Sequence, residues 1–191
     1  MRGQALIVLF GVLSTPGPTL ALSTATGLAI CVDGTGYRTM ADTDQPEPRK
    51  PNTALHFSLE GMSYMGRGQY DRAIPEFNQA IQLDPSNWVN FFERGSAYDY
   101  IGDYSRAIAD YSQALRLDPN NVNLLRVRAI LLGSHKQFNR ALEDLTRAVR
   151  LAPTDPENYK LRALVFRSIG QEDRAAEDYE QAIQLLQSQR R

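Results

Sequence analysis

One seven-residue pattern recurs through most of this chain at a fixed spacing of 34 residues. It stands as GQYDRAI, GDYSRAI, KQFNRAL and GQEDRAA, beginning at Gly68, Gly102, Lys136 and Gly170. A Leu-x-Pro step recurs at the same spacing, beginning at Leu83, Leu117 and Leu151. A fixed period of this length is typical of stacked helical repeats, in which each unit packs on its neighbours. The period therefore predicts an all-α array.

The side chains within each repeat alternate between small and bulky at helical spacing. Counting from Ala54, Trp88, Val122 and Pro156, the eighth, twentieth and twenty-seventh positions are small in all four repeats. The fourth, eleventh and twenty-fourth positions carry bulky side chains. Small residues let two helices approach closely, and the bulky residues fill the space between them. We therefore expect two packed helices in each repeat.

The residues around these segments predict where the helices begin and end. Short polar side chains suited to capping the first helix of each repeat are Thr53, Ser86, Asn120 or Asn121, and Asp155. The corresponding candidates for the second helix are Asp71, Ser105, Asn139 and Asp173. Glycine turns the chain between the two helices in three repeats, and Lys136 predicts a tighter or strained turn in the other. Pro75 is expected early in its helix, where a missing N–H costs least.

These residues resemble the tetratricopeptide repeat (TPR) family, whose signature period they share. The resemblance implies a right-handed solenoid of helical hairpins, with repeats at 54–87, 88–121, 122–155 and 156–189. The seventh position departs from the family pattern, since Glu60, Arg94, Arg128 and Arg162 replace its usual leucine. Because the family binds many unrelated ligands, the resemblance implies an interaction module but names no partner.

Charged residues also recur at the repeat spacing. The seventh position is arginine in three repeats, and the twenty-third is acidic in all four: Glu76, Asp110, Asp144 and Asp178. A second set precedes these acids by four residues: Arg72, Arg106, Arg140 and Arg174. Repetition at equivalent positions favours a structural ladder of ion pairs, including pairs between residues four apart, over a row of anion-binding sites.

The TPR resemblance further implies that the first helices line a concave groove. The groove candidates are Met62, Met65, Phe92, Asp99, Tyr100, Arg126, Lys160 and Arg167. Their order predicts an apolar first half with adaptable methionines, and a basic second half. The five positions at which a co-chaperone groove clamps a terminal carboxylate hold Ser58, Met62, Glu93, Asn123 and Val127. A carboxylate-clamp role is therefore not supported.

Composition gives no indication of catalysis or of nucleic-acid binding. The 191 residues carry a net charge of −1, so no basic excess points to nucleic acid. The two histidines lie in different repeats, and the single cysteine excludes an intrachain disulfide. No nucleophile stands with a positioned base. We therefore expect no enzyme, cofactor or metal site.

The first residues have the order of a secretory signal peptide. A charge at Arg2 precedes the apolar run 5–13, a Pro-Gly-Pro break at 16–18 follows, and cleavage is expected after about Ala21 or Ala25. The apolar run is too short to span a bilayer. Residues 1–25 thus predict export, with the periplasm as the destination. A cytoplasmic protein with an apolar terminus is the alternative.

A proline-rich and acidic stretch separates this segment from the first repeat. Residues 26–53 lack apolar periodicity and are expected to form a flexible, disordered linker. Within them, the run 28–31 is a poor lipobox because Ile30 stands where a small residue is expected, so Cys31 is taken as an unmodified thiol. Residues 33–36 are interpreted as a turn, since neither a strand before them nor a helix after them is expected.

Two hypotheses follow for the function. The first is a scaffold that binds a protein or peptide segment in the groove. The second is an array that self-associates weakly through an uncapped last helix at 173–189, because terminal repeats normally need a polar cap.

Overall fold

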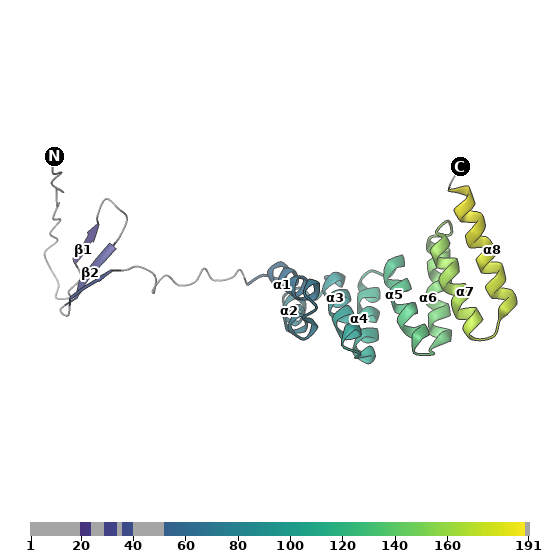
Figure 1. Cartoon of the computed structure of the whole chain (residues 1–191), viewed down its shortest axis with the longest axis horizontal. Coiled ribbons are helices and arrows are strands. Elements are labelled where there is room, and N and C mark those ends of the chain that lie inside the picture. The colour runs from purple at the N-terminus through teal and green to yellow at the C-terminus, as the bar shows by residue number, and fades with distance from the viewer. Residues whose placement is uncertain (1–19, 24–28, 34–35, 40–51, 190–191) are drawn as a thin grey trace. The chain divides into compact units, whose positions relative to one another are not determined.

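The computed structural model describes residues 20–23, 29–33, 36–39 and 52–189. The chain divides into two units, Met1–Lys50 and Pro51–Arg191. The second unit is all-α in its described residues and forms the helical array (Figure 1). Its helices are α1 (Ala54–Gly66), α2 (Tyr70–Leu83), α3 (Trp88–Tyr100), α4 (Tyr104–Leu117), α5 (Val122–Ser134), α6 (Phe138–Leu151), α7 (Pro156–Ser168) and α8 (Glu172–Ser188).

The helices form four hairpins that succeed one another along the array, as the colour gradient of Figure 1 shows. The hairpins are α1–α2, α3–α4, α5–α6 and α7–α8, and the second helix of each packs on the first helix of the next. The first helices begin at Ala54, Trp88, Val122 and Pro156, the predicted first positions of the repeats. The tandem helical-hairpin organisation is therefore confirmed.

The small repeat positions are where the two helices of a hairpin touch. Ala107 and its equivalents Ala73 and Ala141 have no exposed surface. A Cβ added at Gly95 would lie 2.9 Å from the Tyr111 ring, a contact too short to be tolerated without movement. Each bulky side chain thus fills the space that a small one leaves, as the sequence predicts.

The capping residue is predicted correctly for the first helix of three hairpins, and for the second helix of none of the four. Thr53, Asn121 and Asp155 accept the expected backbone hydrogen bonds, but Asn87, rather than Ser86, caps α3. The second helices begin two residues earlier than predicted. Their N-terminal flanking residues are Gln69, Asp103, Gln137 and Gln171, so the predicted caps lie within the first helical turn.

The reason for this shift is the tight connection between the helices of a hairpin. Gly68, Gly102 and Gly170 have positive φ angles of 70–81°, and one residue after each of them is enough to reach the next helix. Lys136 occupies the same place with φ 58°, which confirms the strained turn predicted there. Pro75 consequently lies at the sixth residue of α2, beyond the first turn, so its predicted early position is wrong.

Three short strands are described in the first unit: β1 (Leu20–Ser23), β2 (Ala29–Asp33) and β3 (Gly36–Thr39). They pair antiparallel in the order β1-β2-β3, with Asp33 opposite Gly36. This corrects the prediction of a linker without regular structure at 29–33 and 36–39. The β-branched residues Ile30 and Val32 favour a strand.

The remaining predictions for the N-terminal region lie largely outside the described residues. Residues 1–19 and 24–25 of the predicted signal peptide (1–25) lie outside them, as do 26–28, 34–35 and 40–51 of the predicted linker (26–53). Of the cleavage region, only Leu20–Ser23 is described, as β1. Within the part of the chain that the structure describes, no helix is both long and apolar enough to cross a bilayer.

Candidate functional site

Three arginines at the seventh repeat position hold the hairpins together. Each makes a two-pronged contact with the acid at the twenty-third position of its own repeat, with N–O distances of 2.6–2.8 Å. The pairs are Arg94–Asp110, Arg128–Asp144 and Arg162–Asp178. All three aspartates are buried, with 5–6% of their surface exposed. Bidentate geometry with buried carboxylates is the strong form of this interaction.

Two of these arginines also reach the preceding repeat. Arg94 Nη1 donates to Asn78 Oδ1 at 2.7 Å, and Arg128 Nη1 donates to Ser112 Oγ at 2.9 Å. Asn78 and Ser112 occupy the same position in the first and second repeats. The arginines are therefore engaged within the fold, and the structural interpretation of the ladder is confirmed over that of an anion-binding row.

The second set of arginines does not make the predicted pairs with acids four residues later. Each instead donates to the side chain three residues earlier, which flanks the start of the second helix: Arg72–Gln69, Arg106–Asp103, Arg140–Gln137 and Arg174–Gln171. In the second, third and fourth repeats, the acid at the twenty-third position already receives an arginine from the other helix. Hydrogen bonds from the backbone and side chain of Arg106 lower the pKa of Asp103.

The apolar half of the predicted groove is present on the first helices. Met62, Met65 and Phe92 are partly buried, and the ring of Phe92 lies 5.7 Å from that of Tyr111. Tyr100 is 67% exposed, and its ring stacks on Tyr70 at 4.5 Å. The first half therefore offers aromatic and thioether surface to a partner.

The basic half of the predicted groove is largely engaged by the chain itself. Arg126 pairs with Asp155 at 2.6 Å and also donates to Asn123. Lys160 lies 3.4 Å from Glu157. Arg167 is exposed and, unlike Arg126 and Lys160, has no partner among the described residues. The structure thus does not gather these three side chains into one open cationic patch.

An apolar cavity of about 280 Å³ opens between α5, α6 and α7. Its walls include Ala129, Phe138, Leu145 and Leu161, and its edge carries Ile130 and Leu164. Ile130 is 55% exposed and Leu164 is 41% exposed. Both stand at the ninth repeat position, which belongs to the predicted groove. The sequence signal for this cavity was therefore the presence of isoleucine and leucine at a repeat position that the groove pattern places on the partner-facing side.

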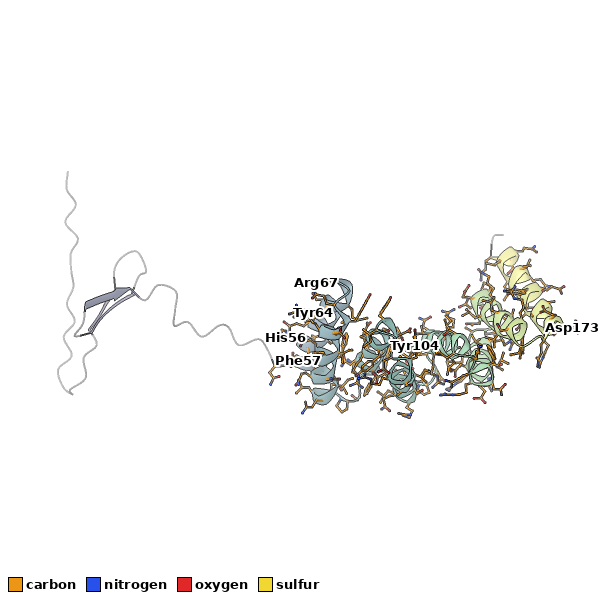
Figure 2. The ribbon with its side chains drawn as sticks, turned by 60° about the horizontal axis from the view of Figure 1, so that its bottom comes forward. His56, Phe57, Tyr64, Arg67, Tyr104 and Asp173 are labelled. Carbon is orange, nitrogen blue, oxygen red and sulfur yellow. The ribbon has the colours of Figure 1, made fainter. Side chains whose placement is uncertain are left out.

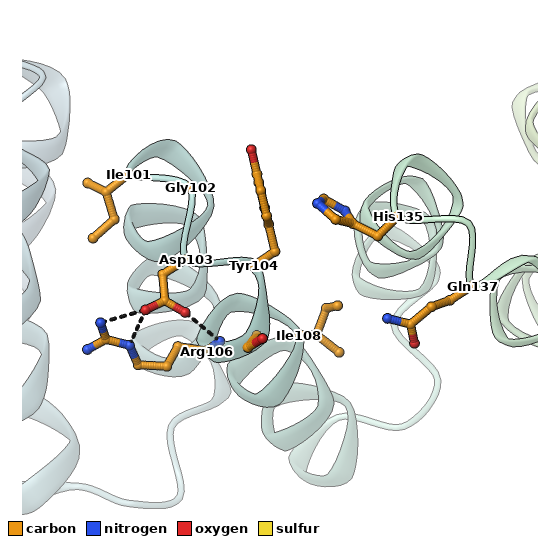
Figure 3. Close-up of a pocket in the computed structure, with 9 residues that line it drawn as sticks. Ile101, Gly102, Asp103, Tyr104, Arg106, Ile108, His135 and Gln137 are labelled. Carbon is orange, nitrogen blue, oxygen red and sulfur yellow. Dashed lines mark hydrogen bonds and ion pairs between the residues drawn. The ribbon is translucent and has the colours of Figure 1, made fainter.

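A second cavity, of about 420 Å³, lies between the α3–α4 hairpin and α5. Its lining comprises Asp99, Tyr104, Val127, Ile130, Leu131, Ser134 and His135. Figure 3 shows an adjoining cavity whose lining also includes Tyr104 and His135, and the centroids of these two rings are 3.9 Å apart. His135 ends α5, as its sequence position predicts, and its Nδ1 lies 2.9 Å from the Leu131 carbonyl oxygen. Sequence reasoning found Asp99 but missed both rings.

Two carboxyl groups on α3 lie in partly dehydrated surroundings. Burial raises the pKa of Glu93 and, against the field of His135, also raises the pKa of Asp99. Burial also raises the pKa of Tyr111, close to both acids, to about 12. Since burial disfavours the ionised form, these acids are held at a cost to stability near neutral pH.

We expect Asp99→Asn to raise the melting temperature at pH 7. The folded state binds the Asp99 proton more tightly than the unfolded chain, so stability is lost as the pH rises from the unfolded pKa through the folded pKa. The amide removes this loss, and the difference between the variant and the parent should vanish at pH values below the ordinary pKa of 3.8. Melting curves at several pH values measure this. A variant less stable than the parent at pH 7 would contradict it.

The geometry defines a class of protein, namely a short helical-hairpin solenoid whose first helices carry open cavities. In the residues that the structure describes, no three histidine, cysteine or acidic side chains group closely enough to hold a metal ion. The chain belongs to the tetratricopeptide repeat family, whose model matches residues 58–122, 92–156 and 126–189. The TPR fold is a scaffold for protein–protein interaction, and members of the family are generally non-catalytic.

Solved structures with the same fold include two of MamA. The crystal structure of MamA aligns with a TM-score of 0.69 and 20% identity, over 73% of this chain and 81% of that chain. MamA from Desulfovibrio magneticus RS-1, residue 41 to the end, aligns with a TM-score of 0.67 and 19% identity, over 73% of this chain and 78% of that chain. The first TPR of Spaghetti (RPAP3), bound to the HSP90 peptide SRMEEVD, aligns with a TM-score of 0.58 and 24% identity. The alignment covers 62% of this chain and 94% of that chain. At these identities the likeness shows the fold alone. No curated protein sequence matches the chain.

Proposed function

We propose that this protein is a non-catalytic scaffold that binds an extended or helical segment of a protein partner across α3, α5 and α7. The observation that carries the proposal is the pair of cavities on these helices, which share Ile130 as a common wall. Cavities with apolar walls and a few polar groups are the usual form of a binding site. The Spaghetti TPR bound to an HSP90 peptide supports the same use of the fold.

The chemistry of the cavities describes the segment that would fit them. The cavity at Ile130 and Leu164 takes an apolar side chain of the partner. An acidic residue of the partner would lie beyond it, near the exposed Arg167. Arg126 and Lys160 can contribute only by exchanging their present partners Asp155 and Glu157, so their share of the binding energy is reduced.

A matched pair of substitutions tests the groove. Ile130→Asp places a charge between the two cavities, whereas Ile183→Asp makes the same change on α8, at 52% rather than 55% exposure. In a pull-down from an envelope fraction, we expect Ile130→Asp to lower partner capture about tenfold or more, as for a central interface residue, because it would place an unpaired charge in an apolar contact. Ile183→Asp should capture as the parent does.

The charge-reversed variant Arg126→Glu/Lys160→Glu tests the basic half of the groove in the same assay. We expect a smaller loss of capture than for Ile130→Asp. Equal capture by Ile130→Asp, Ile183→Asp and the parent, at equal yield, would exclude binding at the groove.

The second candidate function is self-association through α8. Ile183 occupies the repeat position of Leu115, which is 6% exposed and packs in an apolar cluster between repeats. Its exposure on the last helix leaves an apolar face that a second copy could cover. Light scattering on the parent and on Ile183→Asp separates the two functions. A parent that is monomeric at tens of micromolar would remove this candidate.

The proposed location is the periplasm, on the strength of the order of charge, apolar run and break in the first residues. We expect the mature protein made in a bacterial host to begin near Leu22 or Thr26. Intact-mass measurement on the fractionated protein measures this. Recovery of the uncleaved chain from the cytosolic fraction would contradict export and leave the cytoplasmic alternative.

A further inference from the structure

We infer that the cavity beside Asp99 is a site for a single cationic side chain, a lysine or arginine of the bound partner. The inference rests on the proposed function for the source of the side chain, but the site itself is a property of the fold. Its elements are a carboxylate, an apolar floor and two aromatic rings that line one cavity of about 420 Å³. Neither the family resemblance nor the groove pattern assigns this role to Asp99.

The Asp99 carboxylate lines this cavity, where the field of His135 acts on it from the same lining. Among the described residues, no donor makes a hydrogen bond to the Asp99 side chain, although burial disfavours its charge. The more deeply buried aspartates Asp110, Asp144 and Asp178 are each paired with an arginine, whereas Asp99 is not. A partly buried carboxylate left open beside a cavity gains most from a ligand that brings a positive charge.

The surroundings of the carboxylate suit a long cationic side chain. Val127, Ile130 and Leu131 provide an apolar surface for the methylene groups of a lysine or arginine. The Tyr104 ring at the edge of the cavity can interact with the charged head through its π face. Arg126, on the neighbouring helix α5, is already paired with Asp155.

These features exclude two other occupants of the cavity. An anionic group would meet the carboxylate of Asp99, whose ionised form burial already disfavours. A purely apolar side chain would cover the carboxylate without replacing its lost hydration, which costs free energy. The other cavity on the groove face, at Leu164, has no carboxylate in its lining and is where an apolar side chain fits.

The probes for the test are three capped amino acids: the N-acetyl, N-methylamide derivatives of lysine, arginine and norleucine. Norleucine keeps the straight apolar stem and lacks the charge. Each probe is titrated into the full-length, ¹⁵N-labelled protein, and the backbone amide shifts are followed. We expect the lysine or arginine probe to move the resonances of Asp99, Ile130, Leu131 and His135, and to bind about tenfold more tightly than norleucine, as expected for a charge-assisted hydrogen bond.

Two variants decide whether the carboxylate is responsible. Asp99→Asn should reduce binding of the cationic probe to the norleucine level, whereas Asp173→Asn, the same change on α8, should leave it unaltered. Figure 2 shows Tyr104 in the middle of the helical array and Asp173 on its last hairpin. Equal binding of lysine and norleucine, or unchanged binding by Asp99→Asn, would overturn the inference.

The two proposals fail separately in these measurements. Binding of the cationic probe with unchanged partner capture by Ile130→Asp would keep the site and exclude the groove function. Loss of capture by Ile130→Asp without any preference for the cationic probe would keep the groove function and exclude the site.

Discussion

Replacing Arg128 by methionine is expected to lower the free energy of unfolding by about 3–5 kcal/mol, the usual cost of breaking a buried ion pair from one side. Asp144, which is 5% exposed, would lose both of its hydrogen bonds from the guanidinium group and keep its charge. Ser112 of the preceding repeat would lose its donor as well. Urea unfolding followed by circular dichroism measures the change.

Two further variants show whether the stranded charge is the cause. Arg150→Met makes the same substitution at an exposed position of α6 and should change stability by no more than about 0.5 kcal/mol. Arg128→Met/Asp144→Leu removes both charges and should recover much of the loss, since apolar replacement of a buried pair is often neutral. Equal stability of Arg128→Met and Arg150→Met would show that the ladder contributes little.

Ala107→Trp is expected to destabilise the protein by about 1–3 kcal/mol or more, because overpacking a close helix contact forces backbone shifts. Ala107 has no exposed surface and packs in a cluster with Tyr98, Tyr111 and Leu131. Ala109→Trp on the exposed side of the same helix is the matched control, with little expected effect. The melting temperatures of the two variants, compared with that of the parent, measure the difference. Equal melting would mean that the twentieth repeat position does not face the neighbouring helix.

The period and the small positions made the array predictable, because each repeat solves the same packing problem and repeats the solution in its sequence. That is why the first residues of α1, α3, α5 and α7 were found directly. The starts of the second helices were not, because Asp71 and its equivalents are good caps by residue type alone. The positive φ angle of Gly68 determines where α2 begins, because it places Gln69 directly before the first residue of that helix.

The candidate site was predictable only as a set of positions. Asp99, Tyr100 and Arg126 stand where the family resemblance places groove residues. The pairing of Arg126 with Asp155 joins residues in adjacent repeats, and no local pattern announces it. The cavity beside Asp99 depends on two rings, from Tyr104 and His135, that lie outside the groove positions. Its existence follows from how neighbouring hairpin turns are spaced, which only the assembled structure gives.

The arginine ladder has a consequence for recognition. Arg94, Arg128 and Arg162 fix α3, α5 and α7 to the second helices of their hairpins, and the first two also fix the spacing to the previous repeat. The surface formed by these helices is therefore preorganised, so a partner that binds there as we propose would spend little binding energy on ordering it. In the binding mode that we propose, this fixed spacing would favour segments whose cationic and apolar side chains are separated by the distance between adjacent repeats.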